Sequence, residues 1–379
     1  YIKDLLPLID DDNEHVRSDA IYTLSCLGDK SLVETILPKL EDGNPHVRLI
    51  TIRALVKLGG PAMVKEHNLM KPILDLLENE YTVELAIKTL GELGDKSVIK
   101  ELLPLMKDKE TRIVLDAAYA LVRLDGPLVI KEYGLLGDIL TILKDKREEN
   151  EYRRGEAVQL LGRLNDRSLV KYILPLLNDK SKYVRSQVIR ALEASGDKAI
   201  IKDLLPIVSN DVNPQIRLET ALIIHKLGGP SAIREHSVAR QILSCLQDIN
   251  KNTQTDTLTV LGRLGDNSVA KEIIPMLKDA DEKIELSAAW ALAQLKDIRA
   301  LPVLIEAIDR QGSFYEFAPG GGHYLSPLSQ EAQKGLEKLT GKIMPGSRTD
   351  KEQMVRNWKD WWAKDGKTWY EEEVKKIKE

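Results

Sequence analysis

The chain repeats one helix-like pattern, V-R-x-x-A-x-x-x-L-x-x-L-G, at intervals of about 31 to 44 residues along its 379 residues. Clear copies begin at Val16, Val47, Val184 and Ile216. A period of this length is typical of solenoids, in which one helical unit is stacked many times and buries its apolar face only against its neighbours. We therefore expect an all-α fold, a right-handed superhelical solenoid of about ten helix pairs.

Ten copies align on the first residue of the second helix of each pair. These residues are Val16, Val47, Thr82, Ile113, Arg153, Val184, Ile216, Thr253, Ile284 and Leu328. Apolar residues recur at positions 1, 5, 9 and 12 of each copy, the stripe of an amphipathic helix with one buried face. Position 5 is small or β-branched, which predicts close packing between neighbouring helices.

Two polar or backbone features also recur. A proline stands in the first helix of most pairs, as at Pro7 and Pro104, and predicts a kink because proline lacks a backbone donor.

An aspartate precedes an arginine by six residues, as in Asp11 and Arg17. We expect this aspartate to cap the second helix and to bind an arginine of the next repeat, forming a ladder. The ladder should be broken where the arginine is replaced, at Val83, Val114 and Glu285.

These repeats resemble HEAT repeats, specifically the short bacterial type called PBS-lyase-like. The longer copies, which begin after Gly59-Gly60-Pro61 and Gly228-Gly229-Pro230, carry extra segments at 62–69 and 231–238. In this they are similar to armadillo repeats, where a short additional helix precedes the main pair. The resemblance covers nearly the whole chain and implies an interaction scaffold. It also includes lyases for bilin pigments, but no residue set in this chain matches a lyase site.

The regular pattern stops after Asp309, which suggests three segments. We expect a solenoid over 1–309, an irregular last repeat with a Gly/aromatic insertion over 310–346, and a Trp-rich capping helix over 347–379. A terminal repeat exposes an apolar face that such a helix would cover. The insertion is also a candidate ligand loop, because its glycines would let a ligand approach the backbone. Its candidate residues are Phe314, Tyr315, Phe317, His323 and Tyr324.

The sequence gives little sign of chemistry. The net charge of −4 lacks the basic excess of a nucleic-acid binder, and Cys26 and Cys245 are too far apart in sequence to suggest a disulfide framework. No H-E-x-x-H or paired-cysteine motif, nucleophile elbow or Gly-rich cofactor loop is present. We therefore predict no catalytic residues, no metal and no cofactor. We expect a cytoplasmic protein without a membrane span, or an exported one if a leader preceded Tyr1.

Positions 4, 7 and 11 of the second helices should share an exposed, concave face. Position 4 is often acidic and position 11 often basic, so acidic and basic ridges should run in parallel. Between them, position 7 varies and includes Tyr, Arg and Trp, the residues that dominate binding energy at interfaces. The candidate partner-binding residues are Tyr22, Arg53, Lys88, Tyr119, Gln159, Arg190 and Trp290.

The sequence therefore favours a non-enzymatic scaffold that binds a protein or peptide along the second helices. Two other classes stay open. One is a lyase-like or chaperone-type protein that handles a prosthetic group, and the other is a nucleic-acid-binding repeat protein, for which the charge is unfavourable. The identity of the partner and the oligomeric state are not readable from the sequence.

Overall fold

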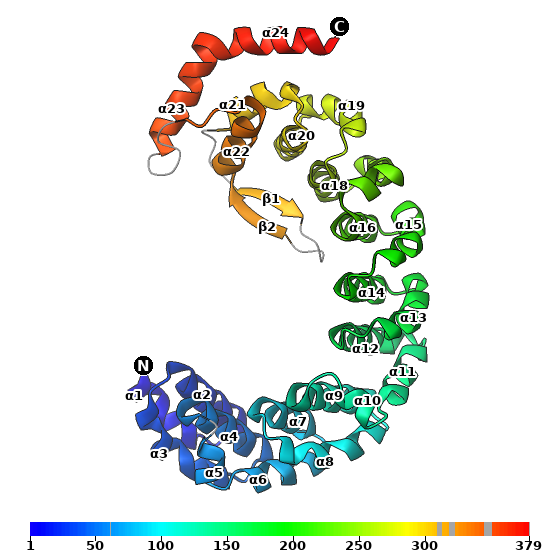
Figure 1. The fold of residues 1–379 in the computed structure, drawn as a ribbon. Helices are drawn as coiled ribbons and strands as arrows, with labels where there is room; N and C mark the ends of the chain where they lie inside the picture. Colours follow the sequence, from blue (N-terminus) through cyan, green and yellow to red (C-terminus); the bar gives the residue numbers. More distant parts are fainter. Residues whose placement is uncertain (61, 309–312, 318–322, 345–350, 379) are drawn as a thin grey trace. The chain divides into compact units, whose positions relative to one another are not determined.

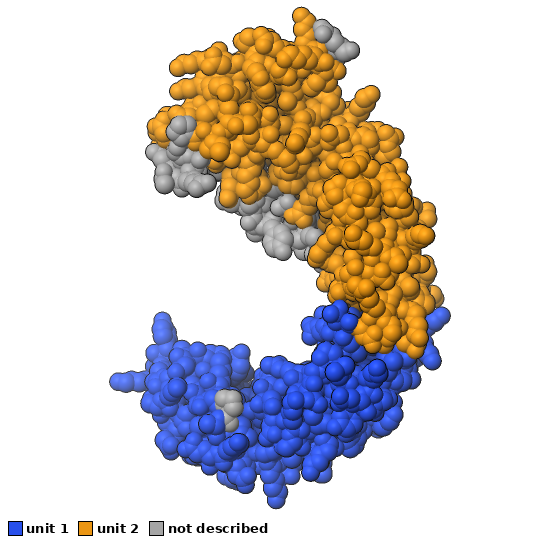
Figure 2. Space-filling view, in the orientation of Figure 1, with its two compact units in different colours: residues 1–165 blue, residues 166–379 orange. Residues whose placement is uncertain are grey.

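The computed structural model describes all residues except 61, 309–312, 318–322, 345–350 and 379, and also leaves out the side chains of 148, 313–317, 323–329, 351 and 378. The chain divides into two compact units, Tyr1–Asn165 (unit 1) and Asp166–Glu379 (unit 2) (Figure 2). In each unit, helix pairs stack in sequence order (Figure 1). This arrangement confirms the predicted all-α solenoid. The division falls within the segment 1–309, and the predicted boundaries at 309 and 346 stay a prediction.

Ten second helices form at the predicted places. They are α2 (Glu14–Leu27), α4 (Pro45–Gly59), α7 (Val83–Leu93), α9 (Thr111–Asp125), α12 (Glu151–Arg163), α14 (Lys182–Ser195), α16 (Pro214–Glu235), α18 (Lys251–Leu264), α20 (Glu282–Gln294) and α22 (Leu328–Thr340). Every residue at position 5 is buried. Where that residue is a threonine, as at Thr51 and Thr220, its hydroxyl donates to the carbonyl four residues earlier. The buried hydroxyl therefore has a hydrogen-bond partner.

The first helix of each pair is short. These helices are α1 (Ile2–Leu5), α3 (Val33–Ile36), α6 (Met70–Asp75), α8 (Ile99–Leu102), α11 (Leu136–Lys144), α13 (Val170–Ile173), α15 (Ile201–Asn210), α17 (Val238–Gln241), α19 (Ala270–Ile273) and α21 (Leu301–Ala307). The recurring proline has a stronger effect than the predicted kink. At Pro7 and Pro104 the α-helix gives way to a 3₁₀ segment, η1 (Leu6–Asp10) or η6 (Leu103–Lys107), because the proline supplies no α-helical donor. In α15, Pro206 is instead accommodated inside one helix.

The same kind of 3₁₀ segment follows several other first helices. These segments are η3 (Leu37–Glu41), η4 (Leu76–Glu78), η9 (Leu174–Asn178), η11 (Leu243–Gln247) and η13 (Ile274–Lys278). A further 3₁₀ turn, η7 (Glu148–Asn150), precedes α12.

The turns between repeats are of two kinds. Short turns begin with a left-handed residue, usually a glycine such as Gly28 at φ +73° but Asn165 or Lys296 in two of them, and continue with an aspartate whose side chain caps the next turn, as Asp29 does for Ser31. The capped turns are η2 (Lys30–Leu32), η5 (Lys96–Val98), η8 (Arg167–Leu169), η10 (Lys198–Ile200), η12 (Asn267–Val269) and η14 (Ile298–Ala300). Long turns contain an extra helix, which is α5 (Ala62–Glu66), as predicted at 62–69, or α10 (Val129–Glu132), or a bend in α16 at Gly229 before the predicted segment 231–238.

The insertion after the ninth second helix forms a β-hairpin, where the sequence suggested only an irregular segment. Strand β1 (Ser313–Phe317) pairs antiparallel with β2 (His323–Pro327), with Tyr315 opposite Leu325. Strand β1 lies against α18 and α22, and β2 lies against α22 (Figure 1). The hairpin is therefore packed on the second helices of unit 2.

The C-terminal segment forms two helices rather than the single expected one. Helix α23 (Lys351–Trp361) continues through a π-helical turn, η15 (Trp362–Gly366), into α24 (Lys367–Lys378). Trp358 is fully buried, and Trp361 lies within 5.7 to 6.3 Å of three neighbouring tryptophan rings. Helix α24 contacts η14, the turn that directly precedes α21, which is the first helix of the last pair. The aromatic segment thus packs on the end of the solenoid, in agreement with a cap.

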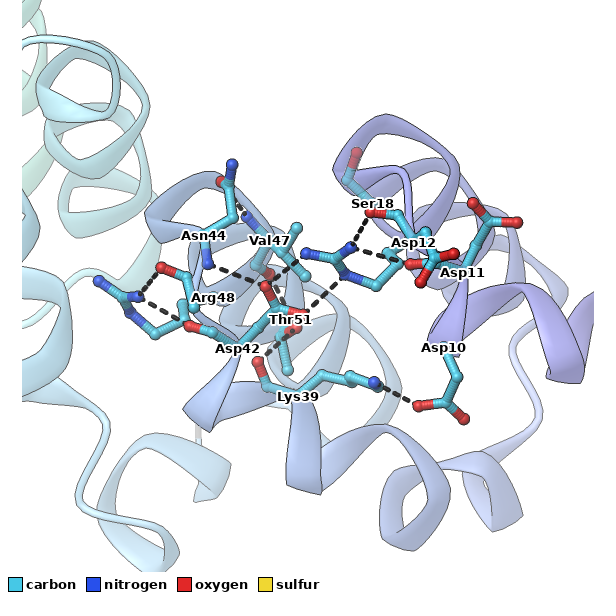
Figure 3. Close-up of polar contacts among 12 residues, drawn as sticks. Asp10, Asp11, Asp12, Ser18, Lys39, Asp42, Asn44, Val47, Arg48 and Thr51 are labelled. Carbon is cyan, nitrogen blue, oxygen red and sulfur yellow. Dashed lines mark hydrogen bonds and ion pairs between the residues drawn. The ribbon is translucent and has the colours of Figure 1, made fainter.

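We predicted that the aspartate of the Asp–Arg pattern caps the second helix, and this prediction was wrong. Asp42 accepts a hydrogen bond from the backbone amide of Asn44, at 2.9 Å, and Asn44 is the residue that caps α4 (Figure 3). Asp11 and Asn13 repeat this arrangement before α2. The capping residue therefore lies two residues after the aspartate, because the Asn side chain sits directly before the first turn of the helix.

The ladder exists, but it runs opposite to the predicted direction. Arg17 binds Asp42 of the following repeat through Nε–Oδ2 and Nη2–Oδ1 contacts of 2.8 and 2.9 Å. Its Nη1 donates to the carbonyl of Asp11, in its own repeat. Arg185 binds Asp211 in the same bidentate way, with both side chains buried. Each such arginine ties its own loop to the next repeat.

Candidate functional site

The second helices of unit 1 present an open face, the surface made by their residues at positions 4, 7 and 11. Four predicted residues lie on it with much of the side chain accessible: Tyr22 is 57% exposed, Lys88 is 52% exposed, and Gln159 and Arg53 are at least partly exposed. Tyr119 is half-buried between them. The structure thus places these predicted partner-binding residues on one side of the helices of unit 1.

A hollow of about 470 Å³ opens on this face between α7, α9 and α12, and we call it the Tyr119 hollow. Its volume is within the range of ligand pockets, roughly 300 to 1,000 Å³. It is lined by Lys88, Glu92, Asp116, Tyr119, Arg123 and Arg163, above a floor of small residues. The floor depends on Gly91, since a Cβ there would lie 3.0 Å from the Ala120 Cα. Glycine therefore lets α7 approach α9 closely beneath the hollow.

Tyr119 is held in place from two sides. Its hydroxyl lies 3.0 Å from the Glu156 carbonyl oxygen, to which it donates, and 3.2 Å from Oε1 of Gln159. The guanidinium of Arg163 lies over its ring, 5.4 Å from the centroid, in a cation–π contact. These contacts fix the ring at one wall of the hollow, so a partner would meet a preordered aromatic surface.

Lys88 and Asp116 also line the hollow, with Nζ and Oδ2 3.3 Å apart. Burial raises the pKa of Asp116 above its ordinary value, and the nearby Lys88 ammonium opposes this shift only in part. Glu84 and Glu156 raise the pKa further through like-charge repulsion. A carboxylate is therefore kept in a partly dehydrated place on the open face, where its charge is poorly compensated.

A second hollow, of about 600 Å³, shares Lys88 with the first. It is lined by His46, Glu80, Tyr81, Glu84 and Arg112 near the beginnings of the helices. Arg112 pairs there with Glu84. The two hollows adjoin at Lys88, and the lining of each contains both acidic and basic side chains.

One polar cluster on the open face escaped the sequence reasoning. Lys57 Nζ lies 3.1 Å from Cys26 Sγ and 5.4 Å from the centroid of the Tyr22 ring. The hydrogen bond from Lys57 lowers the pKa of the exposed Cys26 thiol. Cys26 and Lys57 both occupy position 11, in consecutive repeats. Comparing position 11 of neighbouring repeats would therefore have identified this pair from the sequence.

In unit 2, position 4 of the second helices is buried and position 7 is buried in part, which corrects one predicted site residue. Trp290 is only 5% exposed, and its Nε1 donates to Oε2 of Glu331 at 3.1 Å, so its ring is part of the packing. Asp256 and Thr259 of α18 are also buried. The hairpin accounts for part of this closure, because β1 lies against α18 and α22, where the sequence suggested open helices, while Trp290 of α20 is buried with Glu331 of α22.

Arg190, the remaining predicted partner-binding residue, is exposed but engaged. Its Nη2 lies 3.2 Å from Oε1 of the buried Glu219. Ser186 donates to the other oxygen of that carboxylate at 2.8 Å. Arg190 therefore compensates a buried charge, and its removal would disturb the packing as well as the surface.

The predicted loop site lies on the hairpin. Phe314, Tyr315 and Phe317 fall on β1, while His323 and Tyr324 fall on β2, but their side chains lie outside the described part of the chain. Among the described residues, no three His, Cys, Asp or Glu side chains gather as a metal site would require. In the same residues, no helix combines the length and the apolar character needed to span a bilayer. Both described cysteines are free thiols.

Comparison with known proteins points to one family. A family model described as HEAT repeats matches residues 2–66, 138–233 and 239–315, which is more than half of the chain. A similar solved structure is the crystal structure of an engineered protein from the Northeast Structural Genomics Consortium. It is 15% identical, with 89% of this chain and 98% of that chain covered, at a TM-score of 0.43. No curated protein matches the chain.

Proposed function

Because this chain belongs to the HEAT-repeat family, we propose that it is a non-enzymatic scaffold that binds a protein or peptide along the open face of unit 1. The observation that carries this proposal is the Tyr119 hollow. It combines a preordered tyrosine, exposed arginines and a floor of small residues in one recess. Tyrosine and arginine anchors in a recessed site are typical of the residues that dominate interface energy.

The residues that support binding are Tyr22, Arg53, Lys88, Tyr119 and Gln159, all on unit 1. Trp290 does not belong to this set, because it is buried against Glu331. Arg190 contributes only as the ion-pair partner of Glu219. The proposed surface is therefore narrower than the column of residues from which it was first inferred.

The proposal is tested by affinity capture with Tyr119→Ala beside a matched control. We expect proteins retained by the unmodified chain to bind Tyr119→Ala at least about tenfold more weakly, as for an interface anchor. Tyr133→Ala is the control, since Tyr133 is 48% exposed at the end of α10 and lines neither hollow. Circular dichroism establishes that both variants fold. Equal retention by all three proteins would contradict the proposal.

A further inference from the structure

We propose that the Tyr119 hollow recognises an acidic segment of its polypeptide partner, with carboxylates of that segment bound by Arg123 and Arg163. This inference rests on the proposed function and specifies the chemistry of the partner. The occupant would be a stretch in which Asp or Glu residues alternate with small or aliphatic ones. Three properties of the hollow point to this class.

The first property is the availability of two guanidinium groups. Arg163 is exposed and contacts the face of the Tyr119 ring, a contact that uses none of its N–H donors. Within the described part of the chain, its side chain makes no hydrogen bond or ion pair. Arg123 is 63% exposed, and its nearest acidic atom is Glu92 Oε1 at 4.0 Å, beyond hydrogen-bond distance. Both forks are therefore open to bidentate binding of a carboxylate.

The second property is that the neighbouring charges of the open face are already paired. Arg53 binds Glu92 at 3.0 Å, so the acid nearest to Arg123 is already engaged by another arginine. Lys88 binds Asp116 at 3.3 Å and compensates this acid in part. The charges that keep hydrogen-bond donors available to the hollow are the two arginines at position 11 of α9 and α12. An incoming carboxylate would bind these donors and would replace at most the 4.0 Å contact between Arg123 and Glu92.

The third property is the apolar floor that lines the hollow together with the two arginines. Ala120 and Val122 of α9 line the hollow, together with Gly91 and the ring of Tyr119. A small or aliphatic side chain next to the bound carboxylate would cover this floor and shield the ion pairs from water. The floor therefore favours a mixed acidic and apolar peptide over a purely charged one.

A continuous polyanion fits this surface poorly. Nucleic acids carry phosphates at a regular spacing and need a contiguous basic stripe. Here the basic end of the hollow is bordered by Glu92 and Asp116, and the adjoining hollow contains Glu80 and Glu84. Separate carboxylates on a peptide can be placed between these acids, whereas a phosphate backbone cannot avoid them.

Panning of a random-peptide display library on the immobilised full chain tests the inference. We expect selected sequences to be enriched in Asp and Glu flanked by small or aliphatic residues. The enrichment should be lost on the double variant Arg123→Glu, Arg163→Glu, and weakened on Arg123→Gln, Arg163→Gln. It should persist on Lys131→Glu, Lys144→Glu, a matched charge reversal of exposed lysines on α10 and α11.

Three outcomes would overturn the acidic-segment proposal. They are no enrichment of Asp and Glu, unchanged enrichment on the arginine reversal, and a labelled oligonucleotide that binds the unmodified chain but not the arginine reversal. The proposed function fails separately, when capture is unaffected by Tyr119→Ala. A captured partner that is lost on Tyr119→Ala but kept by the arginine reversal would leave the scaffold proposal standing and refute the acidic segment.

Discussion

Asp116 and Asp42 are partly buried aspartates whose ionised carboxylates have opposite effects on the stability of the folded chain. Burial raises the pKa of Asp116, while hydrogen bonds from Arg17 and the Asn44 amide outweigh the effect of burial at Asp42 and lower its pKa. A raised carboxyl pKa means that the folded state binds more protons than the unfolded state, so its penalty shrinks as pH falls through the folded pKa. A lowered pKa means that the ionised carboxylate stabilises the folded state at pH values above its ordinary pKa. This stabilisation is lost as pH falls through the folded pKa.

We therefore predict opposite results for the two amides. Asp116→Asn should raise the denaturation midpoint at about pH 7, and this gain should fade near pH 4, around the ordinary aspartate pKa. Lys88 loses little, because it is 52% exposed. Asp42→Asn should lower the midpoint at about pH 7, with the loss shrinking in acid. Urea unfolding at both pH values measures this, and a change of the same sign in both variants would contradict the account.

At the residue scale, the sequence predicted the contact between aspartate and arginine but not its direction. The six-residue spacing of Asp11 and Arg17 shows that both lie at the start of a second helix. It does not show which neighbouring repeat Arg17 faces, since that depends on how consecutive pairs stack. The binding of Arg217 to Cys245 Sγ, at 3.2 and 3.3 Å, illustrates the same limit, because a thiol takes the place expected for a carboxylate.

At the element scale, helix spacing depends on small residues at defined points. A Cβ on Gly262 of α18 would lie 2.8 Å from Trp290 Cζ3 and 2.9 Å from Ala291 Cα. The second atom belongs to the backbone of α20, so the helix itself would have to move. Gly137 in α11 is the matched control, because a Cβ there meets nothing within 4 Å.

We predict that Gly262→Ala destabilises unit 2 by about 1 to 3 kcal/mol, the usual cost of overpacking. Gly137→Ala should be neutral or stabilising by up to about 1 kcal/mol, since alanine favours the helix. Thermal unfolding followed by circular dichroism compares the two variants with the unmodified chain. A melting temperature for Gly262→Ala equal to or above that of Gly137→Ala would show that α18 and α20 are not packed as closely as described.

Regular elements were predictable and irregular ones were not. The 3.6-residue periodicity located the ten second helices, and the Gly59-Gly60-Pro61 turn located the extra helix α5. The hairpin was missed because 311–327 has neither a helical period nor a clear strand alternation. The burial of Trp290 was missed for the same reason, since it depends on packing around that hairpin and α22.

At the scale of the whole molecule, the two units differ in what their second helices offer. Unit 1 keeps an open face with two adjoining hollows. In unit 2, position 4 is buried, position 7 is buried at Leu222, Thr259 and Trp290, and the exposed Arg190 is engaged by Glu219. The sequence predicted a binding column with residues in both units, from Tyr22 to Trp290. The difference between the units depends on tertiary packing, which the repeat pattern does not encode.

The central claim is that partners bind the open face of unit 1. Hydroxyl-radical footprinting of the chain, alone and with its captured partner, tests it most directly because it reports side-chain exposure. We predict protection of Tyr119, Val122 and Tyr22, with no change at Tyr133 or Tyr172, which are exposed on other elements. Protection of Tyr133 or Tyr172, with Tyr119 unchanged, would contradict the claim.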